Sequence, residues 1–98
     1  MSLLISVLTP VWNRSDMLPR VFESLQNQTY KNFEWLVGND GSSDGFRSIF
    51  DQFVDSSLFP IILVDASIRV GKAKIDNHLI KESSGDLILW CDSDDILV

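Results

Sequence analysis

Three carboxylates, those of Asp92, Asp94 and Asp95, follow directly after the apolar run Leu87-Ile88-Leu89-Trp90-Cys91. Like charges crowded at the end of a buried strand repel one another and are costly to desolvate. A divalent cation would remove that cost, because Mg²⁺ and Mn²⁺ prefer hard oxygen ligands and keep positions open for water or phosphate oxygens. The alternative is a solvated acidic turn, and so short a motif does not decide between the two by itself.

A second polar segment, Asn39-Asp40-Gly41-Ser42-Ser43-Asp44, follows another apolar run at residues 33–37. Turn-forming residues dominate this segment, and we expect a Ser or Asp within it to cap the next helix. The segment can also take part in binding. Asp40, at a strand end, could accept a hydrogen bond from the N–H edge of a flat base.

Lys72 and Lys74 follow Gly71 at the start of a predicted helix. Helix N-termini attract anions and a lysine strengthens the effect, although a solvated basic face is the preferred interpretation for Lys74. His78, the only histidine, lies beside the apolar stripe of the same helix and is interpreted as a packing or surface residue. Cys91, the only cysteine, is expected to act as a small hydrophobe, and its isolation indicates a reducing, cytoplasmic setting.

The elements that must position these residues are predicted from the pattern of apolar side chains. Runs rich in Ile, Val and Leu predict four strands, over residues 3–9, 33–37, 61–64 and 86–91. Apolar residues at helical spacing predict three helices, over residues 18–28, 46–54 and 72–83. We expect a cap of the first helix at Ser15 or Asp16, and we expect Ala73, Ile75 and Leu79 of the third to face inward.

This alternation implies one α/β domain with a doubly wound, mainly parallel sheet. In such sheets ligands bind outside the carboxyl ends of the strands, near a switch in strand order. The segments at residues 9–13, 39–44 and 92–95 all follow predicted strands. They are therefore expected to meet at one edge of the sheet.

Length and charge narrow the function further. The chain has 98 residues, 45% of them apolar, which is enough for one small domain with a core. A net charge of −6 argues against nucleic-acid binding, and it means that a phosphate ligand would need a metal ion or nearby Lys and Arg. No apolar run is long enough for a transmembrane segment, and residues 3–8 are interpreted as a strand rather than a signal peptide.

Taken together and in order, these motifs resemble the start of an inverting family 2 glycosyltransferase with the GT-A fold. The motifs are Thr9-Pro10-Val11-Trp12-Asn13-Arg14, the segment at residues 22–30, the segment at residues 39–44, Gly71 with Asn77, and Gly85-Asp86 through Asp95. Each motif is weak alone, but their order over nearly the whole chain is specific.

The resemblance implies a nucleotide-diphosphate sugar donor, with a UDP-sugar expected, and a Mg²⁺ or Mn²⁺ ion. It also implies transfer to the hydroxyl of an acceptor saccharide or lipid-linked glycan in polysaccharide or cell-envelope biosynthesis, with the full-length enzyme against the inner face of the membrane. By matching positions, the donor-binding residues would be Thr9, Pro10, Trp12, Asn13, Asp40, Gly71, Lys72, Asp92 and Ser93. The metal ligands would be Asp94, Asp92 and Asp95.

The chain departs from the family pattern at Asn39, where the first Asp of a pair is usual, at Arg69, where an Asn is common, and at Asp76, where an Arg is common. The family also continues beyond its Asp-x-Asp motif to an acceptor site and a general base. Residues 1–98 are therefore expected to form the donor-binding half, with the base beyond residue 98. The alternative is a catalytically incomplete binding fragment, which an exposed sheet edge or apolar faces would allow to form a homodimer. A phosphohydrolase with Asp92 as nucleophile is disfavoured, because its motif would follow the first strand.

Overall fold

The computed structural model describes residues 3–92, so the predicted site residues Ser93, Asp94 and Asp95 lie outside the described part of the chain. Its elements are β1 (Ile5–Val11), a 3-10 turn (Ser15–Met17), α1 (Leu18–Gln26), β2 (Phe33–Asp40), α2 (Phe46–Val54), β3 (Ile61–Ala66), α3 (Lys72–Glu82) and β4 (Leu87–Trp90). The predicted α/β fold is confirmed. Within residues 3–92, no helix has the length and apolar character needed to cross a membrane.

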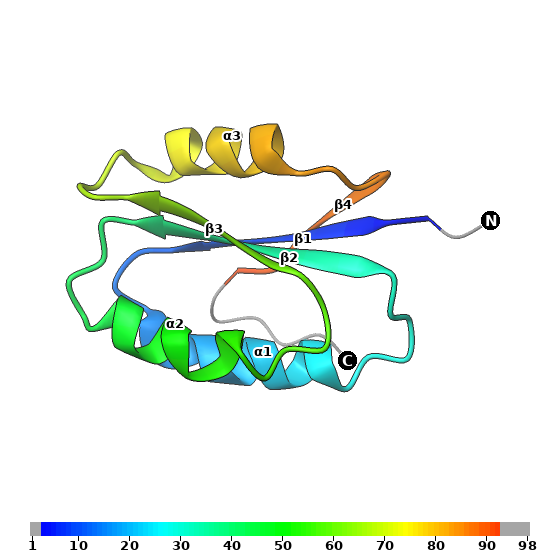
Figure 1. Ribbon diagram of the computed structural model, residues 1–98. Helices are drawn as coiled ribbons and strands as arrows, with labels where there is room; N and C mark the ends of the chain where they lie inside the picture. Colours follow the sequence, from blue (N-terminus) through cyan, green and yellow to red (C-terminus); the bar gives the residue numbers. More distant parts are fainter. Residues whose placement is uncertain (1–2, 93–98) are drawn as a thin grey trace.

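The four strands form one parallel sheet in the order β3-β2-β1-β4. Parallel crossovers are right-handed, so the path from β1 through β2 to β3 puts α1 and α2 on one face of the sheet. The return from β3 to β4 puts α3 on the other face (Figure 1). The strand order therefore switches between β1 and β4, as the predicted doubly wound topology requires.

The larger part of the core lies between the sheet and the layer of α1 and α2. Its aromatic side chains stack, with the ring centroids of Phe22 and Phe53 4.6 Å apart. Buried apolar residues from both strands and helices fill this layer: Val7, Val11, Leu18, Val21, Leu25, Phe33, Trp35, Val37, Phe46, Phe50, Phe53 and Cys91. Because burial of each large side chain stabilises the fold by about 1.5–3 kcal/mol, this layer dominates the stability of the domain.

On the other face, α3 packs its buried residues Ile75 and Leu79 onto the sheet. A Cβ atom at Gly38 would lie 2.9 Å from Cδ1 of Leu79, so the glycine in β2 lets α3 approach the sheet closely. Ile75 and Leu79 were predicted to face inward, and this is confirmed. The same prediction is wrong for Ala73, which is exposed because it lies on the opposite side of the helix.

Three strands extend further toward the site than the sequence predicts, and one of them is β3, which continues through Asp65 to Ala66 where a loop was predicted. β1 continues through Pro10 to Val11, and β2 continues through Gly38 to Asp40. A proline is tolerated within β1 because β4 pairs with β1 only as far as Leu8, so Pro10 has no neighbouring strand on that side. The turn-forming residues at the end of β2 are thus strand residues held by pairing with β1 and β3.

The prediction that residues 87–91 form a buried strand is wrong for the strand itself. Leu87, Ile88, Leu89 and Trp90 are 42–51% exposed, whereas Cys91 is buried as predicted. The physical reason is the position of β4 at the edge of the sheet, where nothing in residues 3–92 covers its outer side. An apolar run identifies a strand, but it does not show whether a neighbouring strand lies beside it.

A buried polar network holds the start of β4 to the centre of the sheet. The Glu34 carboxylate accepts hydrogen bonds from the Ser6 hydroxyl at 2.6 Å and from the Ser84 backbone N–H at 2.8 Å. The Ser6 hydroxyl in turn accepts the Gly85 N–H at 2.8 Å. Burial raises the pKa of Glu34, but the hydrogen bonds from Ser6 and Ser84 together outweigh it, and the pKa is lowered overall.

Candidate functional site

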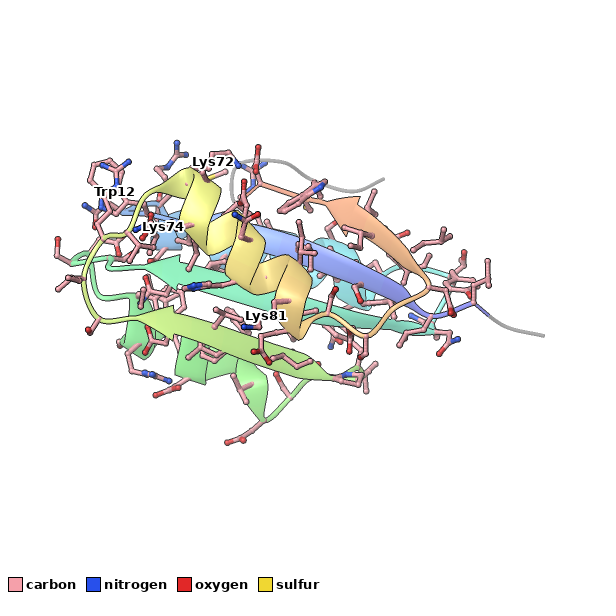
Figure 2. The ribbon with its side chains drawn as sticks, turned by 90° about the horizontal axis from the view of Figure 1, so that it is seen from above. Trp12, Lys72, Lys74 and Lys81 are labelled. Carbon is pink, nitrogen blue, oxygen red and sulfur yellow. The ribbon has the colours of Figure 1, made fainter. Side chains whose placement is uncertain are left out.

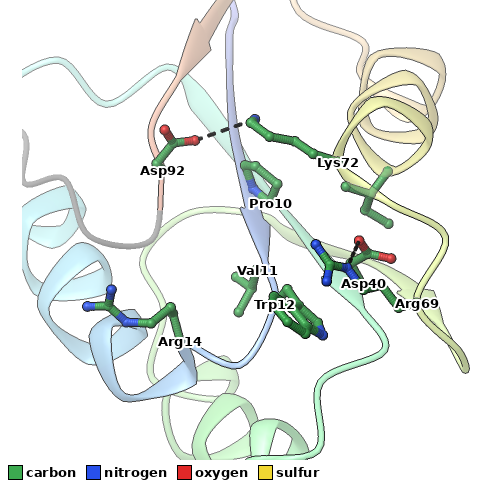
Figure 3. Close-up of a pocket in the computed structure, with 9 residues that line it drawn as sticks. Pro10, Val11, Trp12, Arg14, Asp40, Arg69, Lys72 and Asp92 are labelled. Atoms are coloured by element: carbon green, nitrogen blue, oxygen red, sulfur yellow. Dashed lines mark ion pairs between the residues drawn. The ribbon is translucent and has the colours of Figure 1, made fainter.

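A cavity of about 250 Å³ opens at the carboxyl edge of the sheet. Its lining comes from the ends of β1 and β2, the residues before and within the first turn of α3, and the residue that follows Cys91 (Figure 3). These residues are Pro10, Val11, Trp12, Arg14, Asp40, Arg69, Lys72, Ile75 and Asp92. The cavity lies where β1 and β4 separate, which is the place that this topology provides for a ligand.

Asp40 is the most buried carboxylate of the cavity, with 2% of its surface exposed. Its Oδ1 accepts the Val70 N–H at 2.6 Å, and its Oδ2 accepts the Gly71 N–H at 3.1 Å. Asp40 therefore holds the segment that leads into α3. Since an ionised carboxylate offers about four acceptor positions, it retains capacity to accept a hydrogen bond from a ligand.

Gly41 allows the same segment to pack against the end of β2. Its φ is +69°, and a Cβ atom at this position would lie 2.4 Å from the backbone nitrogen of Arg69. Both facts require glycine, because a side chain would meet rigid backbone and a left-handed conformation is unfavourable for other residues. Asp40 and Gly41 together position residues 68–71 as one wall of the cavity.

Arg69 covers the exposed ring of Trp12 at this wall. Its guanidinium carbon lies 3.5 Å from the Trp12 ring centroid, and its Nε lies 3.9 Å from Oδ2 of Asp40. The stacked cation and indole form a flat, half-exposed surface at the cavity. Sequence reasoning treated Arg69 only as a departure from a family pattern. The signal that could have identified it is a cation in the loop after a strand, at the same sheet edge as Trp12.

Lys72 and Asp92 face each other at the mouth of the cavity (Figure 3). The Lys72 Nζ lies 3.9 Å from Oδ1 of Asp92 and 3.0 Å from Oδ2 of Asp76. Oδ1 of Asp76 is buried without a hydrogen-bond partner in the described part of the chain. With Arg14 and Arg69, Lys72 brings three cations to a cavity that has two carboxylates, in a chain of net charge −6. The local charge therefore suits an anionic ligand.

Asn13 does not line the cavity but joins two loops. Its side-chain oxygen accepts the Ser43 N–H at 2.8 Å, and its own N–H donates to the Ser42 hydroxyl at 3.0 Å. Its φ of +53° is a left-handed conformation that asparagine tolerates. The structure thus places Asn13 as a residue that holds the loop after β1 against the loop after β2.

The predicted helix caps are wrong at both loops. Neither Ser15 nor Asp16 caps α1, and α2 follows the N-cap residue Gly45 without a side-chain cap. Instead the Asp44 carboxylate reaches across and accepts both the N–H and the hydroxyl of Ser15. This contact satisfies the backbone N–H of Ser15 at the start of the 3-10 turn, whereas no side chain caps the first N–H groups of α1.

Thr9 and Gly71 are the other predicted donor-binding residues that do not line the cavity. Thr9 is 0% exposed, and its hydroxyl accepts a hydrogen bond from Nε1 of Trp35 at 2.8 Å within the core. Gly71, directly before α3, has a φ of +97°, and its N–H donates to Oδ2 of Asp40 at the cavity wall. His78 is exposed, in agreement with a surface role.

Of the predicted metal ligands, only Asp92 lies within the described residues. Its side chain is half-exposed at the cavity mouth, and a carboxylate oxygen is the donor that Mg²⁺ and Mn²⁺ prefer. No three His, Cys, Asp or Glu side chains within residues 3–92 gather into a metal site. Asp92 therefore fits a cation, and the complete ligand set with Asp94 and Asp95 stays a prediction.

Comparisons with known proteins identify the family and the fold of the chain. The sequence matches the family described as Glycosyl transferase family 2 over residues 6–97. It is 36% identical over 95 residues to the Escherichia coli UDP-Glc:alpha-D-GlcNAc-diphosphoundecaprenol beta-1,3-glucosyltransferase WfgD, a match that covers 97% of this chain and 36% of that protein.

Two solved structures share the fold. S. aureus TarS 1-349 in complex with UDP-GlcNAc has a TM-score of 0.84 at 25% identity, over 94% of this chain and 27% of that one. The mannosyltransferase PcManGT from Pyrobaculum calidifontis, in complex with GDP-Man and Mn2+, has a TM-score of 0.87 at 22% identity. That match covers 94% of this chain and 28% of PcManGT. The chain spans well under half the length of each of these three proteins.

Proposed function

This chain belongs to glycosyl transferase family 2, and on that premise we propose that its cavity binds the nucleotide-diphosphate sugar donor of an inverting glycosyltransferase. In this proposal residues 1–98 form the nucleotide-sugar-binding half of a GT-A domain. The observation that carries the proposal is the cavity between β1 and β4, where buried Asp40, three cations and Asp92 come together.

Each wall of the cavity has a proposed part in binding the donor. Asp40 would accept an N–H of the base, since its carboxylate is buried and already oriented by Val70 and Gly71. Pro10 and Trp12 would provide flat surface for the nucleoside. The diphosphate would then lie toward Lys72 and Asp92 at the mouth.

In this proposal the side chains of Thr9 and Asn13 do not contact the donor, and Gly71 has no side chain that could. All three residues act by holding neighbouring parts of the site in place. Thr9 fixes Trp35 in the core behind the cavity, and Asn13 holds the two loops together. Gly71 directs the start of α3 and its backbone toward the cavity. Ser93, beyond the described residues, would extend the donor site next to Asp92.

Asp92, Asp94 and Asp95 would hold a Mg²⁺ or Mn²⁺ ion in this site. When bound, that ion supplies positive charge that stabilises the diphosphate as it leaves. Lys72 would contribute in the same direction, because its ammonium lies beside Asp92 and can donate hydrogen bonds to phosphate oxygens.

The acceptor would be the hydroxyl of a saccharide or lipid-linked glycan at the inner face of the membrane, in cell-envelope polysaccharide biosynthesis. The name of the E. coli relative, which specifies a diphosphoundecaprenol substrate, supports a lipid-linked acceptor. A general base would deprotonate the attacking hydroxyl, and we place it beyond residue 98.

Calorimetric titration tests the donor site. UDP, GDP and uridine are each titrated with Mn²⁺ present, into the wild-type chain, Lys72→Ala and the control Lys31→Ala. We expect heat from at least one nucleoside diphosphate and roughly fivefold to tenfold weaker binding in Lys72→Ala, because one charge-assisted contact to phosphate is lost. Lys31→Ala should bind like the wild type, since Lys31 lies outside the cavity. No heat with any nucleoside diphosphate would contradict the proposal.

A further inference from the structure

The outer face of α3 combines lysines with exposed apolar side chains. Ile75 and Leu79 pack inward, and Lys74 and Lys81 lie on the exposed side of the helix (Figure 2). These two lysines are seven residues apart, which is two helical turns, so they project from the same side. Neither makes an ion pair within residues 3–92, whereas Lys72 is paired with Asp76.

This face is basic although the molecule is acidic. Residues 67–82 contain four Lys and Arg and two acids, while the whole chain has a net charge of −6. The carboxylates of α2, Asp51 and Asp55, lie on the opposite side of the sheet (Figure 1). The shortest dimension of the molecule is 22 Å, larger than the Debye length of about 8 Å at physiological ionic strength. Salt therefore screens the carboxylates of Asp51 and Asp55 from anything that contacts α3.

Apolar side chains accompany the two lysines. Ile80 is exposed on α3, Ile68 is 73% exposed in the loop before it, and Trp12 is 45% exposed at the end of β1. Trp12 also lines the donor cavity, and Figure 2 shows it beside the first turn of α3. Aromatic and aliphatic side chains interspersed with lysines are typical of surfaces that lie in a membrane interface.

We propose that Trp12, Ile68, Lys74, Ile80 and Lys81, here called the α3 surface, dock the protein on the anionic surface of a lipid bilayer. The inference rests on the proposed function, in which a lipid-linked acceptor must reach the donor. Because Trp12 belongs to both the α3 surface and the cavity wall, docking through this surface holds the cavity next to the plane of the lipid headgroups. Charge complementarity selects the occupant: the two lysines favour acidic headgroups, and the exposed Ile and Trp side chains favour a lipid phase.

Co-sedimentation with vesicles tests this surface. The full chain is mixed with one of two kinds of vesicle. The first contains phosphatidylcholine alone, and the second contains phosphatidylcholine with roughly one third phosphatidylglycerol. The test variant is Lys74→Glu/Lys81→Glu. The matched control is Arg20→Glu/Lys31→Glu, which changes the net charge equally at exposed positions on and after α1, on the other face of the sheet. Circular dichroism establishes that each variant is folded.

We expect binding only to the anionic vesicles, weakened by salt, with a partition coefficient about tenfold or more lower in Lys74→Glu/Lys81→Glu than in the control. An equal decrease of the partition coefficient in both double variants would overturn the proposal, because vesicle binding would then depend on net charge alone. Equal binding to vesicles with and without phosphatidylglycerol would also overturn it.

Nucleotide titration of the same samples separates the two proposals. A chain that binds a nucleoside diphosphate but no vesicles refutes the α3 surface alone, and one that binds anionic vesicles through Lys74 and Lys81 but no nucleotide refutes only the donor site.

Discussion

The Asp44 carboxylate accepts two hydrogen bonds from Ser15, one from its backbone N–H at 2.8 Å and one from its hydroxyl at 2.7 Å. The contact joins the loop after β2 to the loop after β1. Together with the bonds of Asn13 to Ser42 and Ser43, it holds the two loops that border the cavity as one unit. The cavity is thus supported by side chains that lie outside its lining.

Asp44→Ala should destabilise the fold by about 1–2 kcal/mol, because two hydrogen bonds to a partly exposed charged group are lost. Urea unfolding at neutral pH measures this change. Asp55→Ala is the matched control, since Asp55 is exposed at the end of α2 and its side chain makes no hydrogen bond or ion pair within the described residues. Equal stability of the two variants would show that the contact between the loops contributes nothing.

Gly41→Ala should weaken nucleoside diphosphate binding, since the new Cβ would lie 2.4 Å from the Arg69 nitrogen and displace the wall at residues 68–71. Gly45→Ala is a close control. Gly45 also has a positive φ, of +83°, but a Cβ atom added there would have no neighbouring atom within 4 Å. Gly45→Ala should lose about 1 kcal/mol of stability from backbone strain alone, and Gly41→Ala should lose more because its Cβ also meets the backbone of residues 68–69. Only Gly41→Ala should bind the nucleoside diphosphate more weakly in calorimetry. Equal affinities would argue against this wall as part of the site.

Glu34 should make the stability depend on pH in the acid range. Its folded-state pKa is lowered by the hydrogen bonds from Ser6 and Ser84 in spite of burial. The stabilisation is therefore complete above the unfolded-state value of about 4.3, and it is lost as the pH falls from there through the folded-state pKa. Urea unfolding between neutral and acid pH should show a smaller decrease for Glu34→Gln than for the wild type. The exposed Glu23→Gln should retain the full decrease, and an unchanged profile in Glu34→Gln would refute this role.

The exposed edge of β4 predicts self-association of the chain, because Ile88 and Leu89 are more than 40% exposed on a strand whose outer edge pairs with no other strand in residues 3–92. Sedimentation velocity should show a mass that increases with concentration for the wild type. Ile88→Lys/Leu89→Lys should shift it toward the monomer, since lysines on an edge strand oppose pairing. Leu58→Lys, at an exposed position away from β4, is the control. A wild-type chain that is monomeric at every concentration would contradict this prediction.

The order of strands and helices could be predicted from the sequence because each depends on local periodicity. The exposure of β4 could not be predicted, because it depends on whether another strand lies beside Leu87–Trp90. The ends of β1, β2 and β3 were predicted too early for a related reason. Gly38, Asn39 and Asp40 favour turns locally, but pairing with β1 and β3 holds them in strand conformation.

The sequence predicted the edge of the sheet at which the site lies, but not the contacts between its side chains. Asp40, Trp12 and Asp92 line the cavity, as their places in loops after strands implied. Lys72, predicted from its place at the start of a helix, lines it too. Thr9 instead faces the core, because its partner is Trp35 on the neighbouring strand. The stacking of Arg69 on Trp12 likewise joins residues 57 positions apart in the chain. Their places after two strands indicate the same sheet edge, but not that the two side chains touch.

The most direct test of the donor site is the dissociation constant of its best-binding nucleoside diphosphate, measured with Mn²⁺ and again with EDTA, for the wild type and for Asp94→Ala. We expect the wild type to bind at least about tenfold more weakly in EDTA, because the ion offsets the repulsion between carboxylates and diphosphate. We expect Asp94→Ala to stay folded and to lose this dependence on Mn²⁺. A wild-type dissociation constant that is the same with Mn²⁺ and with EDTA would contradict a metal-dependent donor site in this chain.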